Sequence, residues 1–234
     1  MRAIFWKEVK SYFYSPVAYV LIGMFTLISS IFFWPNLLSM SGEFNNNLAT
    51  MGYILIFLVP ILTMRILAED RKNGTEVLLL TSPVNLAGIV LGKYFAAVFV
   101  FLIMVLVSFI YPIILCAFGA SITPQLVGGY IGFILLGASF ISVGVFASAL
   151  SENQVIAAIV SFVGLLIMWI ADGIGGMVGG FMAKILYWFS LLSRYDDFNR
   201  GVLNLSAIVY YLSFISVFIF LTIMIIERRR WSRG

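Results

Sequence analysis

The chain of 234 residues is 62% hydrophobic and only 10% charged, with a net charge of +4 and no histidine. A soluble domain usually carries about 25% charged residues, so this composition excludes a water-soluble protein and predicts an integral membrane protein. The lack of histidine excludes His-ligated metal sites and Ser–His or Cys–His catalytic pairs. Cys116 is the only cysteine, so no disulfide forms within the chain.

Residues 2–15 predict an amphipathic helix that lies in the membrane interface. Their apolar side chains fall on one face at helical spacing, whereas Arg2, Lys7 and Lys10 fall largely elsewhere. Trp6 and the tyrosines suit the level of the lipid headgroups. The alternative interpretation is an irregular flank of the first membrane span.

Six apolar segments are predicted to cross the membrane as helices, because most approach the length of about 20 residues that this requires. The predicted spans cover about residues 17–38, 50–67, 94–118, 126–150, 155–170 and 205–226. We expect Lys93 to be an interfacial anchor that opens the third span. In the fourth span Gly128 and Gly132, and likewise Gly144 and Ser148, stand four residues apart and allow close contact between helices.

Residues 171–200 predict a re-entrant region on the outer side of the membrane, before the last span. The stretch 171–180 is too rich in glycine for a plain continuous helix. Residues 181–189 are apolar but too short to cross a bilayer, and they predict a re-entrant or interfacial helix. Asp172 lies at the end of the fifth span, where the simplest interpretation is that it meets water.

The distribution of positive charge predicts the orientation of the chain. Six spans put both termini on one side of the membrane, and that side holds 11 of the 14 Lys and Arg residues. Those on the other side are Lys184, Arg194 and Arg200. The positive-inside rule therefore predicts a multi-pass protein of the cytoplasmic (inner or plasma) membrane with both termini in the cytoplasm.

The densest block of charge, residues 69–83, follows the second span and is predicted to lie in the cytoplasm. Asn73 can cap a short helix whose third residue, Glu76, reaches back to it, and Pro83 ends that helix. Residues 77–80 give the helix an apolar surface. Charged residues beside leucines suit a docking site for a cytoplasmic partner, although an ordinary solvated loop fits this pattern equally well.

No catalytic or nucleotide site assembles from the sequence. Residues 88–94 look faintly like a phosphate-binding loop, but the spacing is one residue short and Tyr94 stands where Ser or Thr would bind magnesium. Glu152 belongs to a tight turn and is expected to be solvated. We therefore expect this chain to be no enzyme, to bind no cofactor and to have no nucleic-acid partner.

Residues 71–84, followed by Leu91, Gly92 and Lys93, resemble the cytoplasmic segment of ABC-2 type permeases, and within that family the gliding-motility-associated subgroup. In much of the family an acid lies three residues after the glycine, whereas here Glu76 lies two after Gly74. The resemblance covers residues 1–234 as a single permease domain. It implies an all-α membrane fold with six spans, an interfacial N-terminal helix, a cytoplasmic coupling helix and a re-entrant segment.

The resemblance also implies a function and partners. It suggests the membrane-spanning permease subunit of an ATP-binding-cassette exporter, in which a separate cytoplasmic ATPase binds ATP and magnesium. A second permease copy or a homologous permease, and an auxiliary membrane-anchored subunit of the gliding-motility type, would complete the complex in the bilayer. The implied ATPase contacts are Glu69, Asp70, Arg71, Lys72, Thr75, Glu76 and Leu79. The implied outer re-entrant region includes Asp172, Gly175, Gly176 and Lys184.

Two other functions remain open from the residues alone. A dimerising half of a secondary transporter would need ion-coupling acids or broken helices near the bilayer midplane, and the middle of each span is almost free of charge. A non-transporting membrane scaffold needs no such groups. No polar constellation selects a substrate class.

Overall fold

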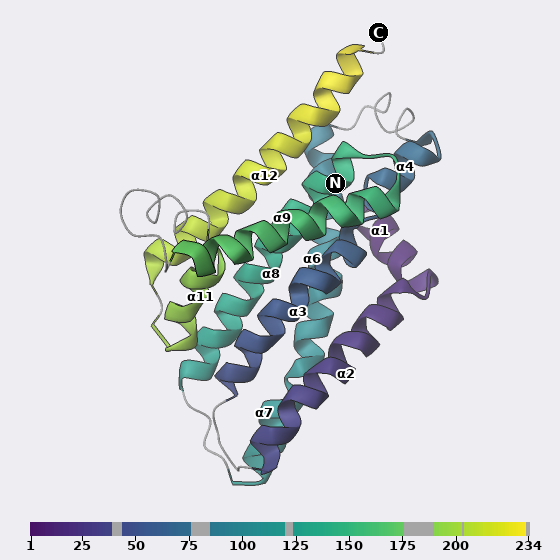
Figure 1. The fold of residues 1–234 in the computed structure, drawn as a ribbon. Coiled ribbons are helices and arrows are strands. Elements are labelled where there is room, and N and C mark those ends of the chain that lie inside the picture. The colour runs from purple at the N-terminus through teal and green to yellow at the C-terminus, as the bar shows by residue number, and fades with distance from the viewer. Residues whose placement is uncertain (39–43, 76–84, 120–123, 176–189, 203, 233–234) are drawn as a thin grey trace.

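The computed structural model describes residues 1–38, 44–75, 85–119, 124–175, 190–202 and 204–232, and the regular structure within them is α-helical. Figure 1 shows the helices packed side by side in a bundle, with α9 running across the front of α8 and α3. The helices are α1 (Arg2–Tyr14), α2 (Val17–Leu38), α3 (Asn45–Thr63), α4 (Ala68–Lys72), α6 (Leu86–Ser108), α7 (Ile110–Ala117), α8 (Pro124–Leu150), α9 (Gln154–Gly175), α11 (Leu192–Asn199) and α12 (Leu205–Ser232).

Among the described residues, six helices or helix pairs are long and apolar enough to cross a membrane, which confirms the six predicted spans. The helix α8 lies at their centre, since its most apolar window is 78% buried, compared with 28%, 22% and 17% for α2, α9 and α12. In α1, Val9 and Tyr12 are buried while Arg2, Lys7 and Lys10 are exposed, as the amphipathic pattern predicts.

The third span begins earlier than the sequence predicts. Its helix α6 starts at Leu86, where the side chain of Asn85 accepts a hydrogen bond from the backbone N–H of Ala87 at 3.3 Å and caps the helix. Lys93 therefore lies inside α6 rather than at its opening. The prediction that it opens the third span is wrong.

The helix of the fifth span continues beyond the predicted end of the span, into the glycine-rich stretch. The helix α9 continues through Asp172 to Gly175, although glycine disfavours helix by about 1 kcal/mol per residue. Continuation is reasonable there because backbone groups near the hydrocarbon region need intrahelical partners. The remainder of the glycine-rich stretch and residues 181–189 lie outside the described residues. Likewise α12 continues to Ser232, past the end of its apolar part.

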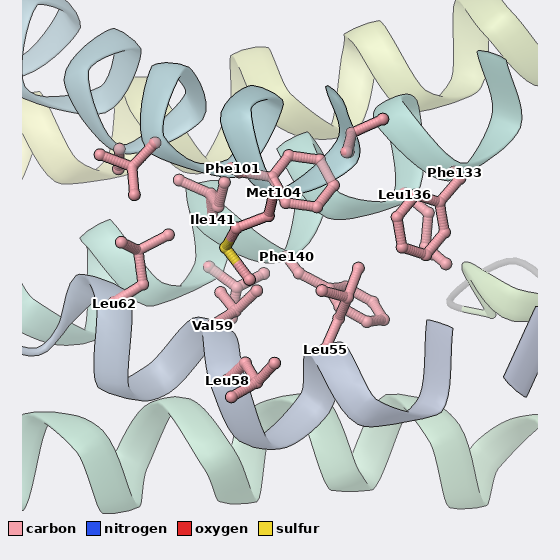
Figure 2. Packing of buried hydrophobic residues seen from close by; sticks show 14 of the residues in the cluster. Leu55, Leu58, Val59, Leu62, Phe101, Met104, Phe133, Leu136, Phe140 and Ile141 are labelled. Atoms are coloured by element: carbon pink, nitrogen blue, oxygen red, sulfur yellow. The ribbon is translucent and has the colours of Figure 1, made fainter. Parts of the chain in front are cut away.

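The core of the bundle forms where α3, α6 and α8 meet, and Figure 2 shows their buried side chains interdigitating. Those labelled in Figure 2 are Leu55, Leu58, Val59, Leu62, Phe101, Met104, Phe133, Leu136, Phe140 and Ile141. Small residues of α8 let its neighbours approach: a Cβ added to Gly144 would lie 2.1 Å from Thr63 Oγ1 of α3, and one added to Gly132 would lie 2.5 Å from Phe198 Cβ of α11. The close helix contacts predicted for this span are confirmed.

A proline breaks the third span between α6 and α7. Pro112 has no backbone N–H, so it leaves the carbonyl of Ser108, four residues earlier, without its helical partner. Tyr130 of α8 donates its hydroxyl to this carbonyl at 3.2 Å. The break is thus stabilised by a neighbouring helix, as a proline within a membrane span requires.

Candidate functional site

The candidate site is the junction between α3 and α4, residues 62–70. Its end of the bundle also carries α1, the 151–153 turn and the C-terminal part of α12, and we call it the basic end (Figure 1). Residues 64–67 form turns between the end of α3 at Thr63 and the start of α4 at Ala68. A break of this kind removes intrahelical hydrogen bonds, and buried backbone groups must then find other partners.

Ser148 of α8 provides three of these partners with a single hydroxyl. Its Oγ donates to the carbonyl of Met64 at 3.1 Å. The same oxygen accepts hydrogen bonds from the backbone N–H groups of Leu67 at 3.0 Å and Ala68 at 3.1 Å. This explains why a small polar residue stands at this position of the fourth span.

Tyr12 of α1 pairs another carbonyl of the junction. Its hydroxyl donates to the backbone oxygen of Leu62 at 2.8 Å, and the ring is 2% exposed. Burial raises the pKa of the Tyr12 phenol well above its usual value, and the nearby Glu8 carboxylate raises it further. Tyr12 therefore stays protonated and remains a hydrogen-bond donor.

The helix α6 also contacts the junction, through Lys93, which lies at the centre of a buried charged group. Its Nζ is 2.8 Å from Glu8 Oε1, 2.6 Å from Asp70 Oδ2 and 2.7 Å from the carbonyl oxygen of Ile66. The lysine side chain is 2% exposed, and those of Glu8 and Asp70 are 14% and 15% exposed. Two of its three N–H donors form hydrogen bonds with Glu8 and the Ile66 carbonyl, and the Asp70 carboxylate adds an ion pair. We call Glu8, Asp70 and Lys93 the charged triad.

The charged triad joins three elements that are distant in sequence. Glu8 comes from α1, Asp70 from α4 and Lys93 from α6. A buried ion pair contributes little net stability, but removing one partner is strongly destabilising because it leaves an uncompensated charge. The triad therefore fixes the position of α4 against α1 and α6.

Arg65 holds the junction against α1 from the other side. Its Nη1 and Nη2 atoms donate to Ser15 Oγ at 3.1 Å and Ser11 Oγ at 2.9 Å, and its Nε lies 3.1 Å from Glu69 Oε2. The guanidinium also lies over the ring of Tyr12, 5.6 Å from the centroid. These contacts orient the guanidinium and fix the angle at which the chain leaves the membrane span.

The turn between α8 and α9 also contacts α4. Arg71 of α4 forms an ion pair of 2.6 Å with Glu152 in that turn, and Arg229 of α12 donates to the carbonyl of Ala149. Glu152 is 56% exposed, as the prediction of a solvated residue requires, but it also pairs with Arg71 of α4, which was not predicted. The sequence could not show this because the partners are 81 positions apart.

The structure brings together most of the predicted docking residues, but several face inward. Glu69, Asp70 and Arg71 pair with Arg65, Lys93 and Glu152, and Thr75 Oγ1 donates to Asp70 Oδ1 at 2.9 Å. Lys72 is exposed, and no ion pair of its side chain is found within the described residues. The remaining predicted contacts, Glu76 and Leu79, lie outside the described residues.

The residue predicted to cap a helix in this loop ends one instead. Asn73 is the C-cap of α4, and Gly74 follows with a positive φ of 70°, a conformation that favours glycine. The helix predicted behind Asn73, with its capping Glu76 and terminal Pro83, lies outside the described residues.

The predicted outer region lies at the opposite end of α8. Asp172 and Gly175 fall on the last turn of α9, whereas the Asp172 side chain, Gly176 and Lys184 lie outside the described residues. The described part of this region also includes α11, whose Phe198 packs on Gly132 of α8.

Sequence reasoning missed the residues that hold the junction from a distance: Glu8, Tyr12, Lys93, Ser148 and Glu152. One signal was present, because a lysine inside an apolar helix needs a buried partner and is by default a functional-site hypothesis. An acid among the basic residues of the N-terminal helix was the matching signal. Their pairing across 85 positions required the fold.

The contacts of this arrangement join helices to one another. Over the described residues, no three His, Cys, Asp or Glu side chains are grouped so that they could hold a metal ion. The groups of the junction pair with one another and hold helices in place. A short charged helix that is fixed to three others can pass a displacement on to all of them.

Six spans define a multi-pass membrane protein. The charged segment at one end, which is held by ion pairs within the chain, suits a transport component that a partner moves. The sequence profile of the ABC-2 family transporter proteins matches residues 17–227. The chain therefore belongs to the ABC-2 family, whose members are the membrane components of ABC transporters rather than catalysts, and membership implies an ABC ATPase partner. No curated protein matches the chain.

Proposed function

We propose that this chain is the permease subunit of an ABC exporter and couples ATP hydrolysis by a separate ATPase to movement of a substrate across the cytoplasmic membrane. The observation that carries the proposal is the attachment of α4 to the spans. Lys93, Ser148 and Tyr12 bind the α3–α4 junction from α6, α8 and α1. A push on α4 would therefore reach several membrane helices at once.

The orientation follows from charge. The basic end carries α1, α4 and the C-terminal part of α12, which together with Arg65 and Lys93 hold most of the 14 basic residues of the chain. We propose that this end faces the cytoplasm, where both termini would lie. The ATPase, with its ATP and magnesium, would then dock from that side.

The ATPase contact is proposed to comprise α4 and the residues after it. Lys72, which is exposed, would contact the ATPase directly, together with Glu76 and Leu79, whereas Thr75 would support α4 through its hydrogen bond to Asp70. Glu69, Asp70 and Arg71 would act differently, because their carboxylates and guanidinium are occupied by partners within the chain. They would position α4 for docking rather than form the main contact.

A second permease copy or a homologous permease would complete the membrane part. The helices α2, α9 and α12 present exposed apolar side chains and leave room both for lipid and for such a partner. The outer region with Asp172, Gly175, Gly176 and Lys184 would cover the far side of the pathway. Export, the gliding-motility subgroup and its auxiliary subunit rest on the resemblance of residues 71–84.

The test separates docking from internal pairing. The tagged chain is purified from its host with the ABC ATPase that accompanies it, and ATP hydrolysis is measured in reconstituted membranes. We expect Lys72→Glu to lower hydrolysis about fivefold or more, which corresponds to the roughly 1 kcal/mol lost at an interface contact. The control is Arg228→Glu, an exposed charge near the end of α12.

A charge swap isolates the role of Arg71. Arg71→Glu breaks the pair with Glu152, and Arg71→Glu/Glu152→Arg restores a pair with the charges exchanged. If Arg71 positions α4, the swap recovers hydrolysis; if Arg71 contacts the ATPase, it does not. The coupling role would be refuted if Lys72→Glu and Arg71→Glu both captured the ATPase and supported hydrolysis as the wild type does. A wild-type chain that captures no ATPase would favour the scaffold or the secondary transporter.

A further inference from the structure

A hollow of about 580 Å³ lies at the basic end, between α1 and the end of α3. It is separate from the charged triad, and neither the docking of an ATPase nor the packing of the spans uses it. Its lining consists of three basic side chains, two serines and a tyrosine: Lys7, Lys10, Arg65, Ser11, Ser15 and Tyr14.

The hollow is positively charged, and part of that charge has no counter-ion within the chain. Lys7 and Lys10 are exposed and form no ion pair with any described residue. Arg65 is paired with Glu69, but its contacts with Glu69, Ser11 and Ser15 leave two of its five N–H donors for another acceptor. The site thus combines two free ammonium groups with an oriented guanidinium.

The position of the hollow selects the source of the anion. The helix α1 is amphipathic, and its exposed Trp6 and Tyr14 are residues that settle at the headgroup level of a bilayer. The first membrane span begins at Val17, two residues after Ser15 of the lining. The basic side chains are therefore placed at the depth of the lipid phosphates.

We propose that this hollow binds the phosphate headgroup of an anionic phospholipid from the leaflet in which α1 lies. Basic sites beside membrane helices are suited to such headgroups, and this hollow is shallow and open, so that a headgroup can reach it from the bilayer surface. Arg65 binds the phosphate oxygens through its fork of N–H groups, and Lys7 and Lys10 contribute as point charges.

The bound lipid would support the junction that the ATPase is proposed to move. Arg65 joins the hollow to the junction, and Ser11 and Ser15 belong to the helix that also supplies Tyr12 and Glu8. A headgroup that bridges Lys7, Lys10 and Arg65 holds α1 against the end of α3. The lipid composition of the membrane would therefore change the stability of the contact between α1 and the α3–α4 junction.

The experiment uses the full chain in a neutral detergent and needs no ATPase, so its outcome is independent of the proposed function. Thermal unfolding is followed during titration with phosphatidylglycerol, with phosphatidylcholine of the same acyl chains, and with inorganic phosphate. We expect phosphatidylglycerol to stabilise the chain and the other two to have little effect. Lys7→Gln/Lys10→Gln should weaken the apparent affinity for phosphatidylglycerol about 30-fold, from roughly 1 kcal/mol per basic residue.

The control is Lys72→Gln/Arg228→Gln, which removes the same charge from exposed positions that lie outside the hollow. It should retain the affinity of the wild type. Equal weakening in both double variants would overturn the site, because binding would then follow net charge alone. Binding of inorganic phosphate as tightly as phosphatidylglycerol would overturn the lipid assignment in favour of a free anion.

Discussion

The charged triad makes a sharp prediction about Lys93. The change Lys93→Met keeps an apolar stem of similar length and removes the charge, so Glu8 and Asp70 are left as two unpaired carboxylates that are 14% and 15% exposed. The Ile66 carbonyl loses its donor as well. Removal of one member of a buried ion pair costs about 3–5 kcal/mol, so we expect a loss of that size in the free energy of unfolding.

The measurement is unfolding of the purified chain in mixed micelles with a rising fraction of denaturing detergent, followed by tryptophan fluorescence. The matched control is Lys72→Met, an exposed lysine that should change the free energy by only about 0.5 kcal/mol. A triple variant, Glu8→Gln/Asp70→Asn/Lys93→Met, removes every charge and should recover much of the loss. The reasoning is wrong if Lys93→Met behaves like the control, or if the triple variant is as unstable as the single one.

Two further predictions concern the packing and the hydrogen bonds around the junction. Gly144→Ala should destabilise the chain by about 1–3 kcal/mol, because its Cβ would overlap Thr63, whereas Gly164→Ala, whose Cβ would have its nearest contact at 3.8 Å, should be nearly neutral in the same unfolding assay. Tyr12→Phe leaves the buried Leu62 carbonyl unpaired and should cost about 1–3 kcal/mol. The pKa of Tyr12 is raised in the folded state, so the contribution of Tyr12 to stability is complete below its unfolded pKa of about 10 and falls at higher pH. Above that pH, the free energy of unfolding should therefore decline less steeply in Tyr12→Phe than in the wild type.

The sequence predicted the spans well because they depend on local composition. Apolar runs of sufficient length identify membrane helices whatever their neighbours are, and the first predicted span coincides with α2. The predicted boundaries were wrong where a tertiary contact changed the local preference. The helix α6 includes Lys93 because its ammonium group donates hydrogen bonds to Glu8 and Ile66 and forms an ion pair with Asp70, whereas a lysine considered alone would mark the end of a span.

The candidate site was predicted only in part, for a related reason. Residues 69–75 stood out by charge, but charge alone cannot tell a side chain that meets a partner protein from one that pairs within the chain. Arg71 and Lys72 are adjacent in sequence, yet one pairs with Glu152 and the other is exposed. The distinction depends on where the turn after α8 lies, and no local pattern encodes that position.

The break between α3 and α4 explains how a push on α4 would spread through the bundle. If α3 continued into α4 as one helix, a displacement of α4 would pass mainly along α3. Turns at 64–67 weaken that route, while the hydrogen bonds of Ser148 and Lys93 link the junction sideways to α8 and α6. Since α8 is the most buried span and its Gly132 packs on Phe198 of α11, a movement received by Ser148 would act on a helix that also contacts α11.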